Sequence, residues 1–222
     1  MRTLYHMWLS PQSRKVRIVL GEKGLECRLK AEKTWERREQ FLKMNPAGDV
    51  PVLVEEDGAI YADGRAIAEY LDETYLDPPL IGTDPKLRAE VRRLCQWFDD
   101  KFMVEVTALL TAEKIMKRFL GMGEPSSEPI RCALQNLKVH LGYISHLAER
   151  RNYLAGDIFS LADITPASHI SVVDYLNDVV WEDFPAAKEW YMRVKSRKSF
   201  RPILKDRIAG LPPPGHYEKL DF

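Results

Sequence analysis

The chain has 222 residues, 45% of them hydrophobic, and its 33 lysines and arginines equal its 33 aspartates and glutamates. This length suits one large or two small domains, and the zero net charge excludes the overall basic field on which nucleic-acid binding depends. The three cysteines are far apart, and the chain has neither a signal-peptide core nor an apolar run near the roughly 18 residues of a membrane span, so we expect a cytoplasmic protein without a metal site or membrane insertion.

The first third of the chain predicts a small α/β domain over residues 1–76. Its expected elements are a strand, a helix, a strand, a short helix, two strands and a helix, at 3–8, 13–23, 27–32, 36–44, 52–55, 59–61 and 64–75. The first three elements form a βαβ unit, in which the two strands run parallel. Asp57-Gly58 is a typical hairpin turn, so the last two strands should be antiparallel.

The rest of the chain predicts helices only. Residues 77–85 contain three prolines and are interpreted as an interdomain linker. An all-helical domain over 86–208 follows, the first helix straight or kinked, with helices at 86–120, 128–150, 163–179, 185–197 and 199–208. Ser160 and Asp163 have the spacing of a capping box. Residues 209–222 contain three consecutive prolines and are expected to form an extended tail that leads away from the domain.

Several local motifs, in this order, resemble those of the glutathione S-transferase superfamily. They are Ser10-Pro11-Gln12-Ser13, Asn45-Pro46 with Val50-Pro51, Asp63-Gly64-Arg65-Ala66-Ile67, and the Ser160–Asp163 box. The resemblance covers about residues 2–208. It implies the GST fold, which is a thioredoxin-like α/β N-terminal domain followed by an all-α C-terminal domain. It also implies a cis peptide bond before Pro51.

The resemblance makes Ser10 the candidate catalytic residue. Glutathione chemistry needs a thiolate near neutral pH, and a hydroxyl donor at a helix N-terminus stabilises that ion. Ser13 is a nearby alternative for this role. The competing interpretation is that both serines only cap the helix that follows them.

The same resemblance assigns glutathione contacts to four residues. The backbone of Val50, before Pro51, would pair with the cysteinyl unit, although this proline can also serve the fold alone. Asp63 matches a family Glu or Gln and could meet the ammonium group. Gly64 replaces the family serine that holds the γ-glutamyl carboxylate, and the loss of one hydrogen bond to a charged group costs about 1.5–3 kcal/mol. We therefore expect no cofactor, and glutathione as a weak ligand at most.

One branch of the superfamily matches more closely, namely the GST-like proteins of alphaproteobacteria that bind the tubulin-like division protein FtsZ. The match includes Ser13 to Arg17, Trp35 and the final stretch 216–222. It implies a homodimer that binds FtsZ filaments and regulates cell division. The expected partner contacts are Trp35, Tyr217, Leu220, Asp221 and Phe222. The competing interpretations are that Trp35 packs under its loop and that the tail docks on its own helical domain.

Two functions from different classes follow from these motifs. The first is an FtsZ-binding regulator with a degenerate glutathione site, and it is favoured by the tail and by Gly64. The second is an enzyme that conjugates glutathione to small electrophiles through Ser10, and it is favoured by the presence of Ser10 and Pro51. We favour the first function and therefore expect a binding protein rather than an enzyme.

Overall fold

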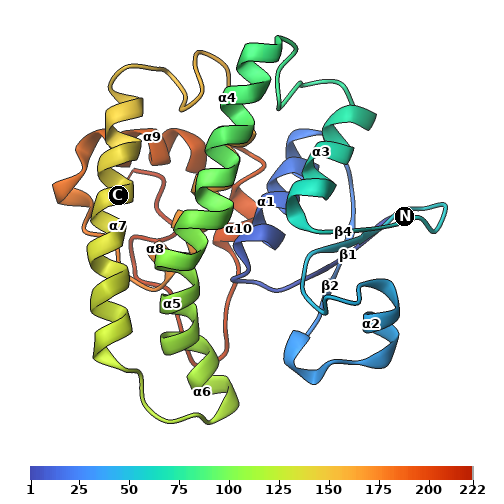
Figure 1. Cartoon of the computed structure of the whole chain (residues 1–222), viewed down its shortest axis with the longest axis horizontal. Helices are drawn as coiled ribbons and strands as arrows, with labels where there is room; N and C mark the ends of the chain where they lie inside the picture. The colour runs from blue at the N-terminus through green and yellow to red at the C-terminus, as the bar shows by residue number, and fades with distance from the viewer. Residues whose placement is uncertain (222) are drawn as a thin grey trace.

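A computed structural model describes residues 1–221, which form an α/β half followed by a helical half (Figure 1). The α/β half contains β1 (Thr3–His6), α1 (Pro11–Glu22), β2 (Arg28–Ala31), the 3₁₀ turn η1 (Thr34–Glu36), α2 (Glu39–Met44), β3 (Val52–Val54), β4 (Ile60–Ala62) and α3 (Gly64–Thr74). The helical half contains α4 (Pro85–Gln96), η2 (Trp97–Thr107), α5 (Ala108–Thr111), η3 (Ala112–Met116), α6 (Lys117–Leu120), α7 (Ser127–Ala148), α8 (Leu161–Tyr175), the 3₁₀ turn η4 (Trp181–Asp183), α9 (Pro185–Lys195) and α10 (Arg201–Leu204).

The α/β half is built on a mixed four-stranded sheet with the strand order β2-β1-β3-β4. Strands β1 and β2 are parallel, and β3 is antiparallel to both β1 and β4, so the predicted βαβ unit and hairpin are confirmed. Leu4 of β1 lies opposite Leu53 of β3, and both side chains are fully buried. Helix α1 lies between the sheet and the helical half in Figure 1, and its Val16, Ile18 and Val19 are fully buried.

The first helical segment of the second half runs without a break from Pro85 to Leu120. No proline or glycine interrupts residues 86–120, so the chain stays helical, but η2 and η3 are wound as π-helix. Helix α8 is the centre of this half, because every one of its residues is buried. Its N-terminus carries the predicted capping box, in which Ser160 and Asp163 satisfy each other's backbone N–H groups.

The last predicted helix is much shorter than expected. The pattern predicted residues 199–208, but α10 spans only Arg201–Leu204. Two residues beyond its end, the Asp206 carboxylate is buried and accepts hydrogen bonds from Arg17 at 2.7 and 2.9 Å. These bonds hold Asp206 against α1 after the helix has ended.

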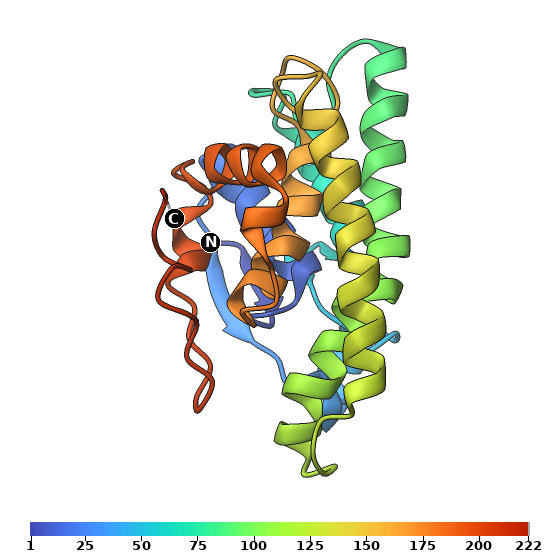
Figure 2. The same ribbon diagram turned by 90° about the vertical axis from the view of Figure 1, so that its left-hand side faces the viewer.

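The C-terminal segment, residues 209–221, does not project from the molecule as predicted but folds back onto it (Figure 2). A turn over 215–218 follows the prolines, and the backbone N–H of Tyr217 donates to the Pro214 carbonyl at 3.0 Å. This turn directs the Tyr217 ring inward, where it has no exposed surface and packs edge-on against Tyr175. The competing interpretation, docking on the chain's own helical domain, therefore describes this conformation.

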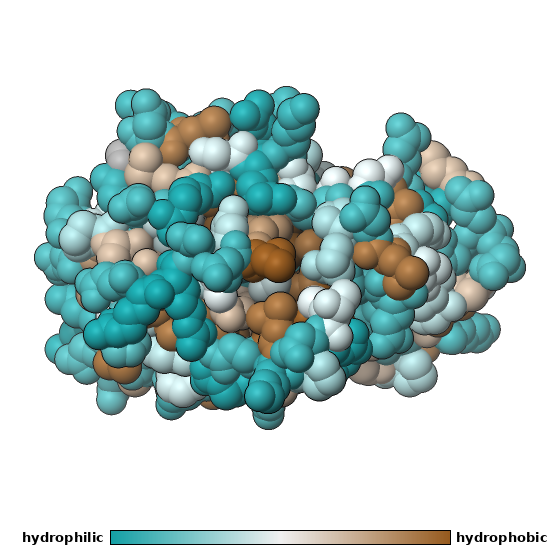
Figure 3. Space-filling view, turned by 90° about the horizontal axis from the view of Figure 1, so that it is seen from above, coloured by the Kyte–Doolittle hydropathy of each residue, from teal (hydrophilic) through white to brown (hydrophobic). Residues whose placement is uncertain are grey.

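The face shown in Figure 3 is mostly hydrophilic, and its hydrophobic atoms gather mainly toward its middle. None of the helices in residues 1–221 has both the length and the apolar character that crossing a membrane requires. Within the same residues, no three His, Cys, Asp or Glu side chains are grouped so that they could hold a metal ion.

Candidate functional site

A mainly apolar cavity of about 190 Å³ lies between the two halves of the molecule. We call it the interdomain cavity. The α/β half contributes Met7, Leu9, Ser10, Pro11, Thr34, Trp35 and Val50, and the helical half contributes Met103, Thr107, Thr111, Ile115, Met116, Phe119 and Ile208. Ser10, Trp35 and Val50, which the sequence singled out separately, therefore meet in one place.

Ser10 stands at the start of α1 and both caps that helix and lines the cavity. Its backbone is extended, and its hydroxyl oxygen accepts a hydrogen bond from the backbone N–H of Ser13 at 3.2 Å. Because the oxygen is the acceptor in this bond, the Ser10 hydroxyl hydrogen remains able to point into the cavity. Ser13 differs, because it is fully buried and its oxygen lies 3.4 Å from the backbone nitrogen of Met7. The geometry therefore favours Ser10 over Ser13 as a ligand contact.

An aromatic pair joins the two halves across the interdomain cavity. Trp35 from η1 and Phe119 from α6 stack with their ring centroids 6.3 Å apart and 22° between the planes. Both rings are partly exposed, and Phe119 retains 41% of its surface. Trp35 therefore lines the cavity and also faces solvent. Phe119 was missed by the sequence reasoning, because nothing near it in the chain marks it as the partner of a residue 84 positions earlier.

Val50 and Pro51 lie on the α/β side of the same cavity. The peptide bond between them is cis, as the resemblance implied. Pro51 is buried beneath the surface while Val50 lines the cavity. The preceding loop is fixed by Asn45, whose side-chain amide donates to the carbonyl of Asp49 at 3.0 Å.

Asp63 and Gly64 stand at the start of α3 and do not line the interdomain cavity. The Asp63 carboxylate already caps its own helix, because it accepts hydrogen bonds from the backbone of Arg65 at 2.7 Å and of Ala66 at 3.0 Å. Gly64 faces the side chain of Gln12, and a Cβ at position 64 would lie 2.2 Å from Gln12 Oε1. Gln12 is held in this position by donating to Asp99 at 2.7 Å. A serine at position 64 would thus collide with Gln12 as it stands.

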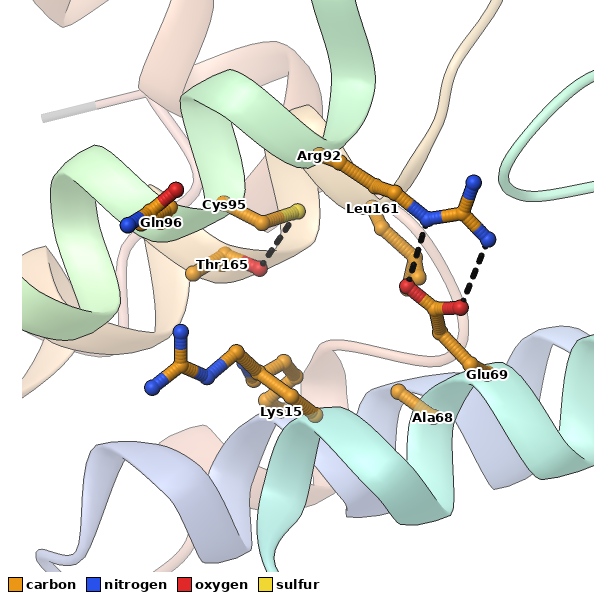
Figure 4. A pocket seen from close by; sticks show the side chains of 9 residues that line it. Lys15, Ala68, Glu69, Arg92, Cys95, Gln96, Leu161 and Thr165 are labelled. Atoms are coloured by element: carbon orange, nitrogen blue, oxygen red, sulfur yellow. Dashed lines mark hydrogen bonds and ion pairs between the residues drawn. The ribbon is translucent and has the colours of Figure 1, made fainter. Parts of the chain in front are cut away.

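A second, polar cavity of about 190 Å³ lies between α3 and α4 (Figure 4). Arg92 donates two hydrogen bonds to Glu69 across it, at 2.9 and 2.7 Å, and these bonds lower the pKa of Glu69. Cys95 lies at its wall, and burial raises the pKa of this thiol to about 12, so it is neutral at pH 7. The cavity therefore offers an ion pair and an unreactive thiol but no activated nucleophile.

A buried ion pair lies beside the second cavity, which Lys15 lines. The Lys15 ammonium contacts the Asp99 carboxylate, and both side chains are almost completely buried. Burial alone would raise the pKa of Asp99, but the charges of Lys15 and His169 and their hydrogen bonds to the carboxylate together outweigh it and lower the pKa to about 2. Asp99 also accepts the hydrogen bond from Gln12, so this pair helps to keep the Gln12 side chain against Gly64.

Family models and relatives point to the same fold. The model described as "Glutathione S-transferase, N-terminal domain" matches residues 4–79, and the model of the corresponding C-terminal domain matches residues 111–198. The FtsZ-localized protein A of Caulobacter vibrioides is 50% identical over all of this chain and 98% of its own length.

Solved structures also match the chain over its whole length. A structure described as a glutathione S-transferase from Rhodospirillum rubrum F11 has a TM-score of 0.98 and 55% identity, with all of both chains covered. The structure of FzlA from C. crescentus has a TM-score of 0.97 and 50% identity, and it covers all of this chain and 99% of that one. Agreement over the full length includes the folded C-terminal segment.

Proposed function

Because this chain belongs to the glutathione S-transferase family, we propose that it uses the family fold as a scaffold, as a cytoplasmic homodimer that binds FtsZ filaments and regulates cell division. The observation that carries the proposal is the 50% identity, over the whole chain, with a protein named for its localisation with FtsZ. We extend that name to direct filament binding by this chain.

The proposed contact residues are Trp35, Leu220 and Asp221. Trp35 is partly exposed beside the interdomain cavity, and Asp221 is exposed at the far end of the C-terminal segment. Leu220 is partly buried against the core. Tyr217 serves a different purpose, because its buried hydroxyl accepts a hydrogen bond from Arg14 at 3.0 Å and so fixes where the segment lies. The expected contact at Phe222 lies outside the described residues.

The proposed degeneracy of the glutathione site rests on the start of α3. Gln12 occupies the space next to Gly64, and Asp63 already caps its own helix. The residue whose hydroxyl holds the γ-glutamyl carboxylate in the resembled family is thus a glycine here, and a side chain at this position would require the end of Gln12 to move. We propose that Val50 and Pro51 remain as parts of the fold.

Co-sedimentation with FtsZ tests the proposed function. Purified protein should pellet with filaments formed from FtsZ and GTP, and the variants Trp35→Ala and Asp221→Arg should each pellet at least tenfold less. Glu124→Arg is the matched control, because Glu124 is exposed in the loop before α7 and should change nothing. The proposal fails if the unaltered protein stays in the supernatant at every FtsZ concentration.

The dimer is tested separately by light scattering coupled to size-exclusion chromatography. A homodimer has twice the 25.7 kDa of the chain. If the measured mass at micromolar concentration is that of one chain, the proposed dimer is wrong. The proposed binding to filaments is not affected by that result.

The position of Ser10 in the interdomain cavity supports a second candidate, conjugation of glutathione to small electrophiles. Calorimetry with millimolar glutathione and a turnover assay with an aryl halide distinguish the two. Heat of binding together with turnover that Ser10→Ala abolishes would establish the enzyme. Absence of both would leave the binding protein.

A further inference from the structure

A strongly basic groove of about 560 Å³ lies between β2 and α10, away from the interdomain cavity. We call it the basic groove and define it by four exposed cations, Lys198, Arg201, Lys205 and Arg207, with Trp8 and Leu29 as apolar lining. A fifth cation of the lining, Arg17, is buried. The chain as a whole is neutral, so this concentration of one sign of charge is a local property of the fold.

The four cations of the basic groove are poorly compensated. The one carboxylate that lines it, Asp206, is buried and engaged by Arg17 at 2.7 and 2.9 Å. Within residues 1–221, the side chains of Lys198 and Lys205 make no hydrogen bond or ion pair, and both residues are exposed. In the same described part of the chain, the guanidinium of Arg201 donates one long bond of 3.4 Å, to the Ser196 carbonyl. The groove therefore retains positive charge for a ligand.

One cation of the basic groove, Arg207, already contacts a carboxylate of the chain itself. It forms an ion pair with Glu218 of the C-terminal segment, which does not line the groove, and about half of each side chain is exposed. This contact leaves Lys198, Arg201 and Lys205 for carboxylates from elsewhere.

The groove also borders an open edge of the sheet. Strand β2 is the first strand in the order and pairs only with β1, so its outer backbone edge pairs with no strand of residues 1–221. Every residue of β2 is exposed, and Leu29 keeps 38% of its surface. An extended peptide can add to such an edge through its backbone, with alternate side chains facing the floor.

From this combination we propose that the basic groove binds an extended acidic segment of a partner protein, which pairs along β2 and places carboxylates against Lys198 and Lys205. The sheet edge and the apolar floor favour a peptide over a small anion, which would use neither. Nucleic acid fits less well, because duplex binders commonly contact about 6–10 phosphates, whereas five cations line the groove and one of them, Arg17, is engaged by Asp206.

The probe is a fluorescein-labelled peptide of eight alternating aspartates and leucines. Fluorescence polarisation measures its binding to the full chain. A peptide of alternating asparagines and leucines is the matched ligand. We expect the acidic peptide to bind at least tenfold more tightly than the amide peptide, and its affinity to fall as salt rises from about 50 to 200 mM, because ion pairs at an open surface are screened.

Charge reversal locates the site. Lys198→Glu/Lys205→Glu should weaken the acidic peptide at least tenfold. The control, Lys86→Glu/Arg131→Glu, changes the net charge equally at two exposed positions outside the groove and should weaken it less than twofold. All four residues are exposed, so thermal melts should show that every variant is folded.

Three results would overturn the proposal. They are equal binding of the acidic and amide peptides, equal weakening by both double variants, and binding of a DNA duplex as tight as that of the acidic peptide. None of these measurements involves FtsZ, so they stand or fall independently of the proposed function.

Discussion

The aromatic side chains of the interdomain cavity and of the C-terminal segment are held in opposite ways. Trp35 and Phe119 stack across the cavity and keep part of their surface exposed. Tyr217 has no exposed surface, packs against Tyr175 and accepts a hydrogen bond from the buried guanidinium of Arg14. A large aromatic residue in a distinctive segment can thus either contact a ligand or stabilise the fold. The burial of its side chain distinguishes these two roles.

The same contrast divides the C-terminal segment. Tyr217 belongs to the core, while Asp221, four residues later, is exposed. Loss of Tyr217 should therefore change stability first and binding only as a consequence. Loss of Asp221 should change binding alone. The following predictions test this division, beginning with the largest expected effect.

Tyr217→Ala should produce the largest loss of stability. The change removes a buried ring and leaves Arg14 with one partner fewer, so we expect the free energy of unfolding to fall by about 3–5 kcal/mol. Urea unfolding measures this fall. Tyr217→Phe keeps the ring and loses only the hydroxyl, and it should cost about 1–3 kcal/mol. An alanine variant as stable as the original protein would mean that Tyr217, like Trp35, is not needed for the stability of the fold.

Acidification should destabilise the protein through His6. This ring is fully buried and neither nitrogen has a hydrogen-bond partner in residues 1–221. Burial, with a smaller effect of the Arg17 charge, lowers its pKa from 6.5 to about 4. In the unfolded chain His6 therefore binds a proton below about pH 6.5, whereas in the folded chain it binds this proton only near pH 4 and below. Stability should fall by about 3 kcal/mol from pH 7 to pH 4 for this group alone.

The control for the pH effect is His6→Gln, which cannot titrate. Its stability at pH 7 is immaterial, because the quantity compared is the loss between pH 7 and pH 4. That loss should be about 3 kcal/mol smaller than in the original protein. Identical losses would mean that other groups cause the acid sensitivity.

Gly64→Ala should destabilise the start of α3 by about 1–3 kcal/mol, because the new Cβ would overlap Gln12 Oε1. Gln12→Ala in the same chain should recover most of that loss. Thermal melts of the two single variants and the double variant form a cycle that isolates the contact. Additive losses would show that Gln12 does not fill this space.

Trp35→Ala should have the smallest effect on stability. The residue is partly exposed, so we expect a loss of about 1 kcal/mol or less in urea unfolding. Filament co-sedimentation of the same variant should nevertheless fall at least tenfold. A large stability loss without a binding defect would reverse the roles of Trp35 and Tyr217.

Local patterns predicted the parts of the fold that neighbours in sequence determine. The Asp57-Gly58 hairpin and the Ser160–Asp163 box were predicted because their contacts span only a few residues. The π-helical winding of η2 was not predicted, since its sequence contains no residue that breaks a helix.

The missed features of the site all depend on contacts between distant residues. Gln12 and Gly64 are 52 positions apart in the sequence, and Arg14 and Tyr217 are 203 positions apart. Spacing rules describe neither contact, because each one exists only after the halves have packed. The proline-rich stretch before Tyr217 favoured an extended tail, and the favourable burial of one aromatic ring outweighed that local preference.

The Arg14–Tyr217 contact also has a consequence for how the protein is made. Arg14 is fully buried, and it donates to Ser171 at 2.8 Å and to Tyr217 at 3.0 Å. The Trp8 carbonyl, which accepts from Arg14 Nε at 2.7 Å, is near Arg14 in the sequence, but Ser171 and Tyr217 are made much later. A guanidinium does not readily leave water before its N–H groups have acceptors. During synthesis, the face of α1 that carries Arg14 therefore gains its buried partners in two steps, first from α8 and then from the segment that contains Tyr217.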